Sequence, residues 1–116
     1  MKKVLLFIIP FVCLLVACGE EVKKPTVKYE RVGGQGKMHF VYMKKSSEVS
    51  KDSYFQVGDY ICKGENVCIV MFWDNKSLVP SSIPMTDKQV DSKVAHYNSN
   101  KNTGMYRVAI CATDGC

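Results

Sequence analysis

The stretch NVCIVMFWD, residues 66–74, is a continuous apolar run between turn-forming residues. A run of this length and composition is typical of a strand that is buried on both faces of a sheet. We therefore expect residues 66–74 to form the central strand of the domain, with the other elements arranged around it.

Two further stretches predict strands on either side of this one in the sequence. Residues 37–44, KMHFVYMK, are rich in β-branched and aromatic residues, a composition typical of strands. Residues 105–111, MYRVAIC, alternate so that Tyr106, Val108 and Ile110 share one face.

The segment between the first two predicted strands, residues 46–64, indicates a helix. Tyr54, Val57 and Ile61 lie at the spacing i, i+3, i+7 of a helical stripe. Gly58 lowers the helix propensity of this segment, so a strand over part of it stays open.

A second helix is predicted over residues 87–98. Thr86 and Gln89 have the spacing of a capping box, in which each side chain bonds the backbone amide of the other residue. Met85 can pack on Val90 as a hydrophobic staple. The apolar positions that continue the helical spacing are Val90, Val94 and Tyr97.

The predicted order is therefore strand, helix, strand, helix, strand. This alternation predicts a small single-domain sandwich of the α/β or α+β class, in which two helices cover a three-stranded sheet. Its 79 residues, 38–116, are near the size at which a hydrophobic core needs additional stabilisation.

Four cysteines of this domain are candidates for that stabilisation: Cys62, Cys68, Cys111 and Cys116. An even number of cysteines in a small domain favours disulfides if the domain is exported. Three pairings are possible, and we favour the two short loops, 62–68 and 111–116, over the crossed pairings.

Two other uses of the cysteines fit the sequence less well. Zinc sites use closely spaced pairs such as CxxC, whereas the gaps here are five and four residues. The stretch VCIVMFWD resembles the central strand of thioredoxin-like folds, but residues 74–77 after it lack the CxxC of those enzymes. We expect neither a metal nor a cofactor.

The beginning of the chain has the pattern of a secretory signal. Lys2 and Lys3 precede a 14-residue apolar run, residues 4–17, which is too short to span a membrane. A polar stretch that contains Glu20 and Glu21 follows it. We therefore expect the first seventeen residues to be a signal peptide.

The end of this apolar run, Leu15-Val16-Ala17-Cys18, resembles the lipobox of bacterial lipoproteins. The resemblance implies cleavage before Cys18, lipidation of its thiol and acylation of the new N-terminus. Several acyl chains anchor a protein stably to a lipid bilayer. Gly19 stands where aspartate is the familiar signal for inner-membrane retention, so the resemblance implies an outer-membrane lipoprotein that faces the periplasm.

Three regions follow from these predictions. Residues 1–17 are the signal peptide, residues 18–37 are the lipidated cysteine and a flexible tether, and residues 38–116 are the globular domain. Without Lys2 and Lys3, the chain carries 14 basic and 11 acidic residues, a net charge of +3. Nucleic-acid binding needs a clustered basic patch, so we expect no nucleic-acid partner.

Sequence motifs for catalysis are absent from the chain. It has no GxSxG and no HExxH, and its two histidines, His39 and His96, stand apart. We therefore assign no catalytic residues. An enzyme of unfamiliar type remains an alternative, with His96 and either Asp91 or Asp74 as its candidate groups.

An apolar loop beside the central strand is the candidate partner-binding edge. Its members are Trp73, Leu78, Val79, Ile83 and Met85. Exposed aromatic and apolar side chains are enriched at binding surfaces. The alternative is that these side chains attach the loop to the core.

Three functions remain. The first is a non-enzymatic lipoprotein that binds an envelope protein or exported ligand, as an assembly, inhibitor or exclusion factor. The second is an envelope-acting enzyme with an unfamiliar active site. The third is a structural lipoprotein. The first is favoured because the domain is small, lacks catalytic motifs and carries an anchor.

Overall fold

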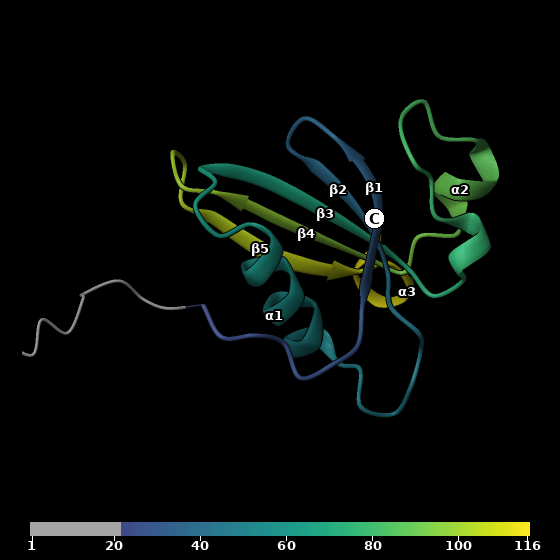
Figure 1. The fold of residues 1–116 in the computed structure, drawn as a ribbon, viewed down its shortest axis with the longest axis horizontal. Helices are drawn as coiled ribbons and strands as arrows, with labels where there is room; N and C mark the ends of the chain where they lie inside the picture. The colour runs from purple at the N-terminus through teal and green to yellow at the C-terminus, as the bar shows by residue number, and fades with distance from the viewer. Residues whose placement is uncertain (1–21) are drawn as a thin grey trace, which may run out of the picture.

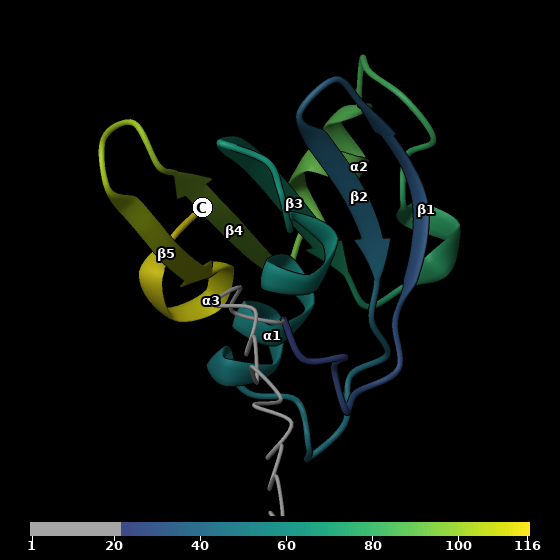
Figure 2. The same cartoon turned by 60° about the vertical axis from the view of Figure 1, so that its left-hand side comes forward.

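A computed structural model describes residues 22–116 of the chain (Figures 1 and 2). The lipobox and the signal peptide lie outside these residues. The elements, in order, are β1 (Glu30–Gln35), β2 (Met38–Tyr42), α1 (Lys51–Ile61), β3 (Val67–Trp73), a 3₁₀ turn (Lys76–Leu78), α2 (Asp87–Asp91), β4 (Ala95–Asn100), β5 (Met105–Ile110) and α3 (Cys111–Asp114).

The strands form one mixed sheet of five strands in the order β1-β2-β3-β4-β5. Strands β2 and β3 are parallel and are connected through α1, whereas the other neighbours are antiparallel. The prediction of a three-stranded sheet is therefore wrong. The central position of the strand predicted at 66–74 is confirmed.

The first additional strand, β1, lies inside the segment predicted to be a flexible tether. A two-residue loop with Gly36 at φ +59° connects β1 to β2. Glycine at the first position of such a loop is typical of a tight hairpin turn. On the other side of β1, the Gly34 N–H donates to the Ser81 carbonyl at 3.1 Å. A loop thus covers part of this sheet edge.

The second additional strand, β4, occupies the latter part of the predicted helix 87–98. The capping box of Thr86 and Gln89 is present, but α2 ends at Asp91. Residues 95–100 instead pair with both β3 and β5. Ala95 and Tyr97 are buried two residues apart, so strand spacing and pairing on both sides prevail over the helical spacing.

Two apolar layers cover the two faces of the sheet. On one face, α1 packs over Val41, Val70, Phe72 and their neighbours. On the other face, the segment between β3 and β4 covers Phe40, Met71 and Trp73. Figure 2 shows α1 and α2 on opposite sides of the sheet.

Gly58 explains how α1 approaches the sheet so closely. A Cβ atom at this position would overlap the ring of Tyr97 on β4. Glycine in a helix interior usually costs stability, but here its missing side chain makes room for a buried aromatic ring.

The segment before β1 also belongs to the folded unit. Val27 and Tyr29 are partly buried and pack against the core cluster beneath α1.

Among the described residues, no helix has the length and apolar character needed to cross a membrane.

The two favoured disulfides are both present. Cys62–Cys68 joins the end of α1 to β3, and its Cα atoms are 5.8 Å apart. Cys111–Cys116 closes the loop around α3, and its Cα atoms are 4.7 Å apart. Cys62 and Cys68 are buried, so the first disulfide forms part of the core.

Candidate functional site

An open groove lies between α1 and the β4–β5 hairpin. Its volume is about 770 Å³. Helix α1 contributes Gln56 and Asp59, strand β4 contributes Tyr97 and Ser99, and β5 contributes Tyr106. Three segments that are distant in sequence therefore form one concave surface.

A carboxylate in the lining of the groove, that of Asp59, accepts two hydrogen bonds from tyrosines. The Tyr97 hydroxyl donates to Asp59 Oδ1 at 2.9 Å, and the Tyr106 hydroxyl donates to Asp59 Oδ2 at 2.9 Å. Asp59 thereby connects the last turns of α1 to both strands of the hairpin. Neutral phenols next to a carboxylate give the groove polar groups in fixed positions.

Burial and Asp59 together keep both phenols protonated. Burial, the hydrogen bond to Asp59 and the negative charge of Asp59 raise the pKa of Tyr106 to about 12. The same causes raise the pKa of Tyr97 further. Both hydroxyls therefore remain protonated hydrogen-bond donors even near pH 10, where an ordinary tyrosine is half ionised.

Tyr97 and Tyr106 form the aromatic part of the groove wall and pack against the ring of Phe55. Phe55 lies 4.9 Å from Tyr106 and 6.4 Å from Tyr97 between ring centroids, and the two tyrosines are 6.0 Å apart. Tyr97 is 2% exposed, whereas Tyr106 and Met105 are 54% and 49% exposed. The groove thus combines an anchored inner ring with an accessible aromatic and apolar rim.

The sequence predicts parts of this site but does not bring them together. It predicts the shared face of Tyr106, Val108 and Ile110, whereas Tyr97 lies on a strand instead of the predicted helix and nothing in the sequence distinguishes Asp59. The missing information is the pairing of β4 with β5, which sets Ser99 opposite Tyr106 and Tyr97 opposite Val108.

The predicted partner-binding edge is mostly part of the second core cluster. Trp73 is fully buried and its indole N–H donates to the Gln89 carbonyl at 2.8 Å. Val79 is buried, and Leu78 and Met85 pack partly buried on the same cluster. Ile83 is 39% exposed. The loop is therefore attached to the core, and Ile83 remains as its accessible member.

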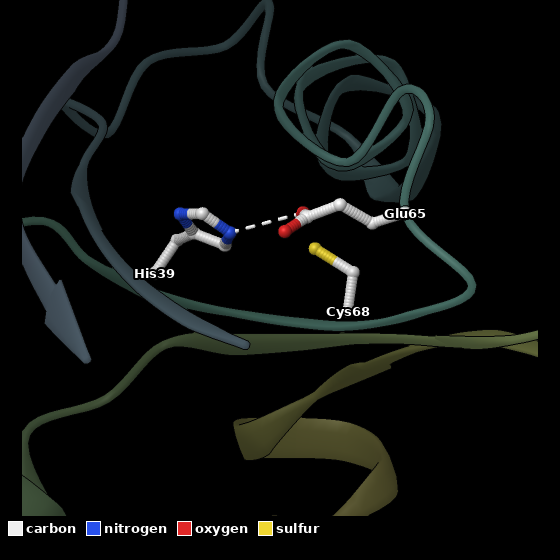
Figure 3. A group of neighbouring side chains, drawn as sticks. All are labelled: His39, Glu65 and Cys68. Carbon is white, nitrogen blue, oxygen red and sulfur yellow. Dashed lines mark hydrogen bonds and ion pairs between the residues drawn. The ribbon is translucent and has the colours of Figure 1, made fainter. Parts of the chain in front are cut away.

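His39 belongs to a second polar cluster near the buried disulfide (Figure 3). Arg31 Nε donates to His39 Nδ1 at 2.9 Å, and His39 Nε2 lies 3.2 Å from Glu65 Oε2. Because Nδ1 accepts from a guanidinium, Nε2 carries the proton and donates to Glu65. Both ring nitrogens are thus engaged, which suits a connection between strands better than proton transfer to a ligand.

The same cluster has the outline of a metal site but lacks its chemistry. Ligand atoms of His39, Glu65 and Cys68 lie within 4.8 Å of one another. Figure 3 shows the three side chains pointing toward one another. However, Cys68 is bonded to Cys62, and metal binding by cysteine requires a thiolate. In the disulfide form, the residues do not fit a metal ion.

His96 is not brought together with the carboxylates proposed as its catalytic partners. It lies on β4, opposite Met71 and Ala109. Burial, together with the positive charges of Lys93 and Arg107, lowers the pKa of His96 to about 4. Its Nε2 is buried and forms no hydrogen bond with the described residues. Asp74 instead borders a smaller hollow at the other end of α1, and Asp91 lies at the end of α2.

Comparisons with known proteins give no relationship for this chain. No protein-family model, no curated protein and no solved structure matches it. A functional assignment therefore depends on the residues of the chain itself.

Proposed function

We propose that the protein is a lipid-anchored, non-enzymatic binding module of the bacterial cell envelope, and that the groove beside Asp59 is its binding site. The anchor is the acylated Cys18 of the lipobox-like sequence Leu15-Val16-Ala17-Cys18. The proposed location is the outer membrane, facing the periplasm. The two disulfides are typical of an exported domain.

The observation that carries this proposal is the combination of groups in the groove. Tyrosines, amides and a carboxylate surround an open volume of about 770 Å³. Ligand sites typically join apolar walls with a few fixed polar groups, and exposed tyrosine is enriched at binding surfaces. The two histidines are less suited to catalysis. His39 is hydrogen-bonded at both ring nitrogens, and His96 is partly buried with no carboxylate partner among the described residues.

The anchor is tested by the mass and location of the protein made in a bacterial host. We expect the mature chain to begin at Cys18, to carry acyl chains and to sediment with membranes. Cys18→Ser should abolish acylation and membrane sedimentation. A wild-type chain that is soluble and not acylated would contradict the proposed anchor.

The binding site is tested by placing a photo-crosslinking side chain at position 105 of the full lipidated protein in cells. We expect this groove position to capture one discrete envelope component, identified by mass spectrometry, and Tyr106→Ala to reduce its capture about tenfold. The matched control variant, Val90→Ala, changes an exposed apolar position of α2 outside the groove and should leave the capture unchanged. Equal capture in the Tyr106→Ala and Val90→Ala variants would count against the groove.

A further inference from the structure

The described part of the chain begins in the wall of the groove. Val22 and Lys23 line it together with α1 and the β4–β5 hairpin, and Figure 1 shows the chain reaching the domain beside α1. Only residues 19–21 separate Val22 from Cys18 in the sequence. Four residue steps extend at most about 14 Å. If Cys18 is lipidated, as proposed above, the groove wall at Val22 lies within about 14 Å of the lipidated residue.

Packing of the residues that follow Val22 keeps the start of the described chain close to the rest of the domain. Val27 and Tyr29 contact the core cluster under α1, and β1 pairs with β2 directly afterwards. A free tether from 18 to 37 would reach about 65 Å. The folded segment removes most of that freedom, so the anchor restrains which side of the domain faces the bilayer.

The rim of the groove carries positive charge suited to such a surface. Lys23, Lys63 and Lys101 line the groove and are exposed. None of the three takes part in the ion pairs found among the described residues. The Lys63 ammonium lies 4.3 Å from the centroid of the Tyr60 ring, which positions it without neutralising its charge.

Negative groups nearby limit which lysines contribute. Glu20 and Glu21 precede Lys23 and Lys24 in the connecting sequence and offset their charge. The Asp59 carboxylate lies inside the groove and accepts from two tyrosines. The attraction to an anionic surface therefore comes from Lys63 and Lys101, and it must exceed the repulsion from the Asp59 carboxylate.

We propose that Lys63 and Lys101 hold the rim of the groove against the phosphates of anionic phospholipids, so that the groove opens toward the membrane that carries the anchor. Each basic side chain near an anionic bilayer strengthens association about fivefold. The occupant of the proposed binding site is thus a phospholipid headgroup surface. The inference rests on the proposed lipidation of Cys18.

The test uses the full lipidated protein in vesicles of phosphatidylcholine, with and without phosphatidylglycerol. The acetylation rates of individual lysines are measured by mass spectrometry, with oxidation of Met105 by peroxide as a second readout. With phosphatidylglycerol at low salt, we expect Lys63, Lys101 and Met105 to react about fivefold more slowly. Lys88 on α2 should react at the same rate in both vesicles. High salt should remove the protection.

Paired variants assign this effect to the rim. Lys63→Gln with Lys101→Gln should abolish the protection of Met105. The matched control, Lys45→Gln with Lys88→Gln, removes the same charge from exposed positions outside the groove and should leave the protection intact. Equal effects of the two variants would show that net charge, not the groove rim, is responsible, and would overturn the inference.

The two proposals fail in different ways. A chain whose intact mass shows no acyl groups overturns the anchor, and the inference falls with it. A lipidated chain whose Lys63, Lys101 and Met105 react equally in both vesicles overturns the inference alone. Capture of a protein in the groove of the anchored chain, without lipid-dependent protection, would also contradict a lipid occupant.

Discussion

At the scale of single residues, Asp59 determines the chemistry of the groove. It accepts hydrogen bonds from two phenols, and its charge opposes their ionisation. We expect Asp59→Asn to lower the pKa of Tyr106 from about 12 toward its ordinary value of 10. The fall should be partial, because burial is the largest cause of the raised pKa and remains.

Titration of tyrosinate absorbance against pH measures this effect. Two tyrosines should ionise at lower pH in Asp59→Asn than in the wild type. Asp87→Asn, which changes an exposed carboxylate of α2, is the matched control and should leave the titration unchanged. Identical curves for Asp59→Asn and the wild type would contradict the described hydrogen bonds.

His96 gives the stability of the domain a pH dependence on the acid side. Its pKa in the folded protein is about 4, compared with an ordinary value of 6.5. The unfolded chain therefore binds a proton that the folded chain excludes between these values. The stabilisation is complete above pH 6.5 and is lost as the pH falls to 4.

The size of this loss follows from the shift. Each pKa unit corresponds to about 1.4 kcal/mol, and solvent screening of a partly buried ring reduces the total to about 1–3 kcal/mol. Denaturant unfolding at pH 7, 5.5 and 4.5 measures it. His96→Phe cannot take up a proton and should have a smaller decrease over this range. A decrease as large as that of the wild type would exclude His96 as its source.

At the scale of elements, the contact of α1 with β4 depends on Gly58. An added Cβ would overlap the buried Tyr97 ring, which its hydrogen bond to Asp59 holds in place. We expect Gly58→Ala to lower the free energy of unfolding by about 1–3 kcal/mol through overpacking, although the same change in an open helix would stabilise by about 1 kcal/mol.

A double-mutant cycle with Tyr97→Ala separates the two effects. Without the ring, Gly58→Ala should become neutral or stabilising, because only the helix propensity remains. Chemical denaturation of the four proteins measures the coupling. An unchanged cost of Gly58→Ala in the Tyr97→Ala background would contradict the close contact.

Local signals in the sequence predicted elements well wherever packing agreed with them. The strand 66–74, the capping box at Thr86 and the two disulfide pairs were all confirmed. The helix predicted over 87–98 is too long, because Val90, Val94 and Tyr97 fit a helical stripe whereas the buried pair Ala95 and Tyr97 fits a strand. Backbone pairing with β3 and β5 decides between these structures, and pairing partners are not visible in a local window.

The candidate site was less predictable for the same reason. Trp73 and Met85 are apolar side chains next to a loop, and sequence alone does not show whether the loop folds back on them. In the structure they belong to the second core cluster. Asp59 has no distinguishing neighbours in sequence, and its partners Tyr97 and Tyr106 are 38 and 47 residues away.

At the scale of the whole molecule, the folded unit begins well before residue 38. β1 pairs along β2, and Val27 and Tyr29 pack on the core. We expect a chain of residues 22–116 to unfold cooperatively at the same temperature as the proposed mature chain, residues 18–116. A chain of residues 38–116 leaves one edge of β2 and part of the core exposed, and should lose about 3 kcal/mol or more, a large share of the stability of a small domain.

An intermediate truncation distinguishes the two contributions of this segment. A chain that begins at Tyr29 keeps β1 but lacks Val27, and should lose about 1 kcal/mol, the value of a partly buried apolar side chain. Thermal and denaturant unfolding, followed by circular dichroism, compare the four chains. If chains of residues 22–116 and 38–116 were equally stable, residues 22–37 would contribute nothing to the fold and would be a free tether. Equal stability would also contradict the proposed restraint between the groove and the proposed lipid anchor, because that restraint depends on the same packed residues.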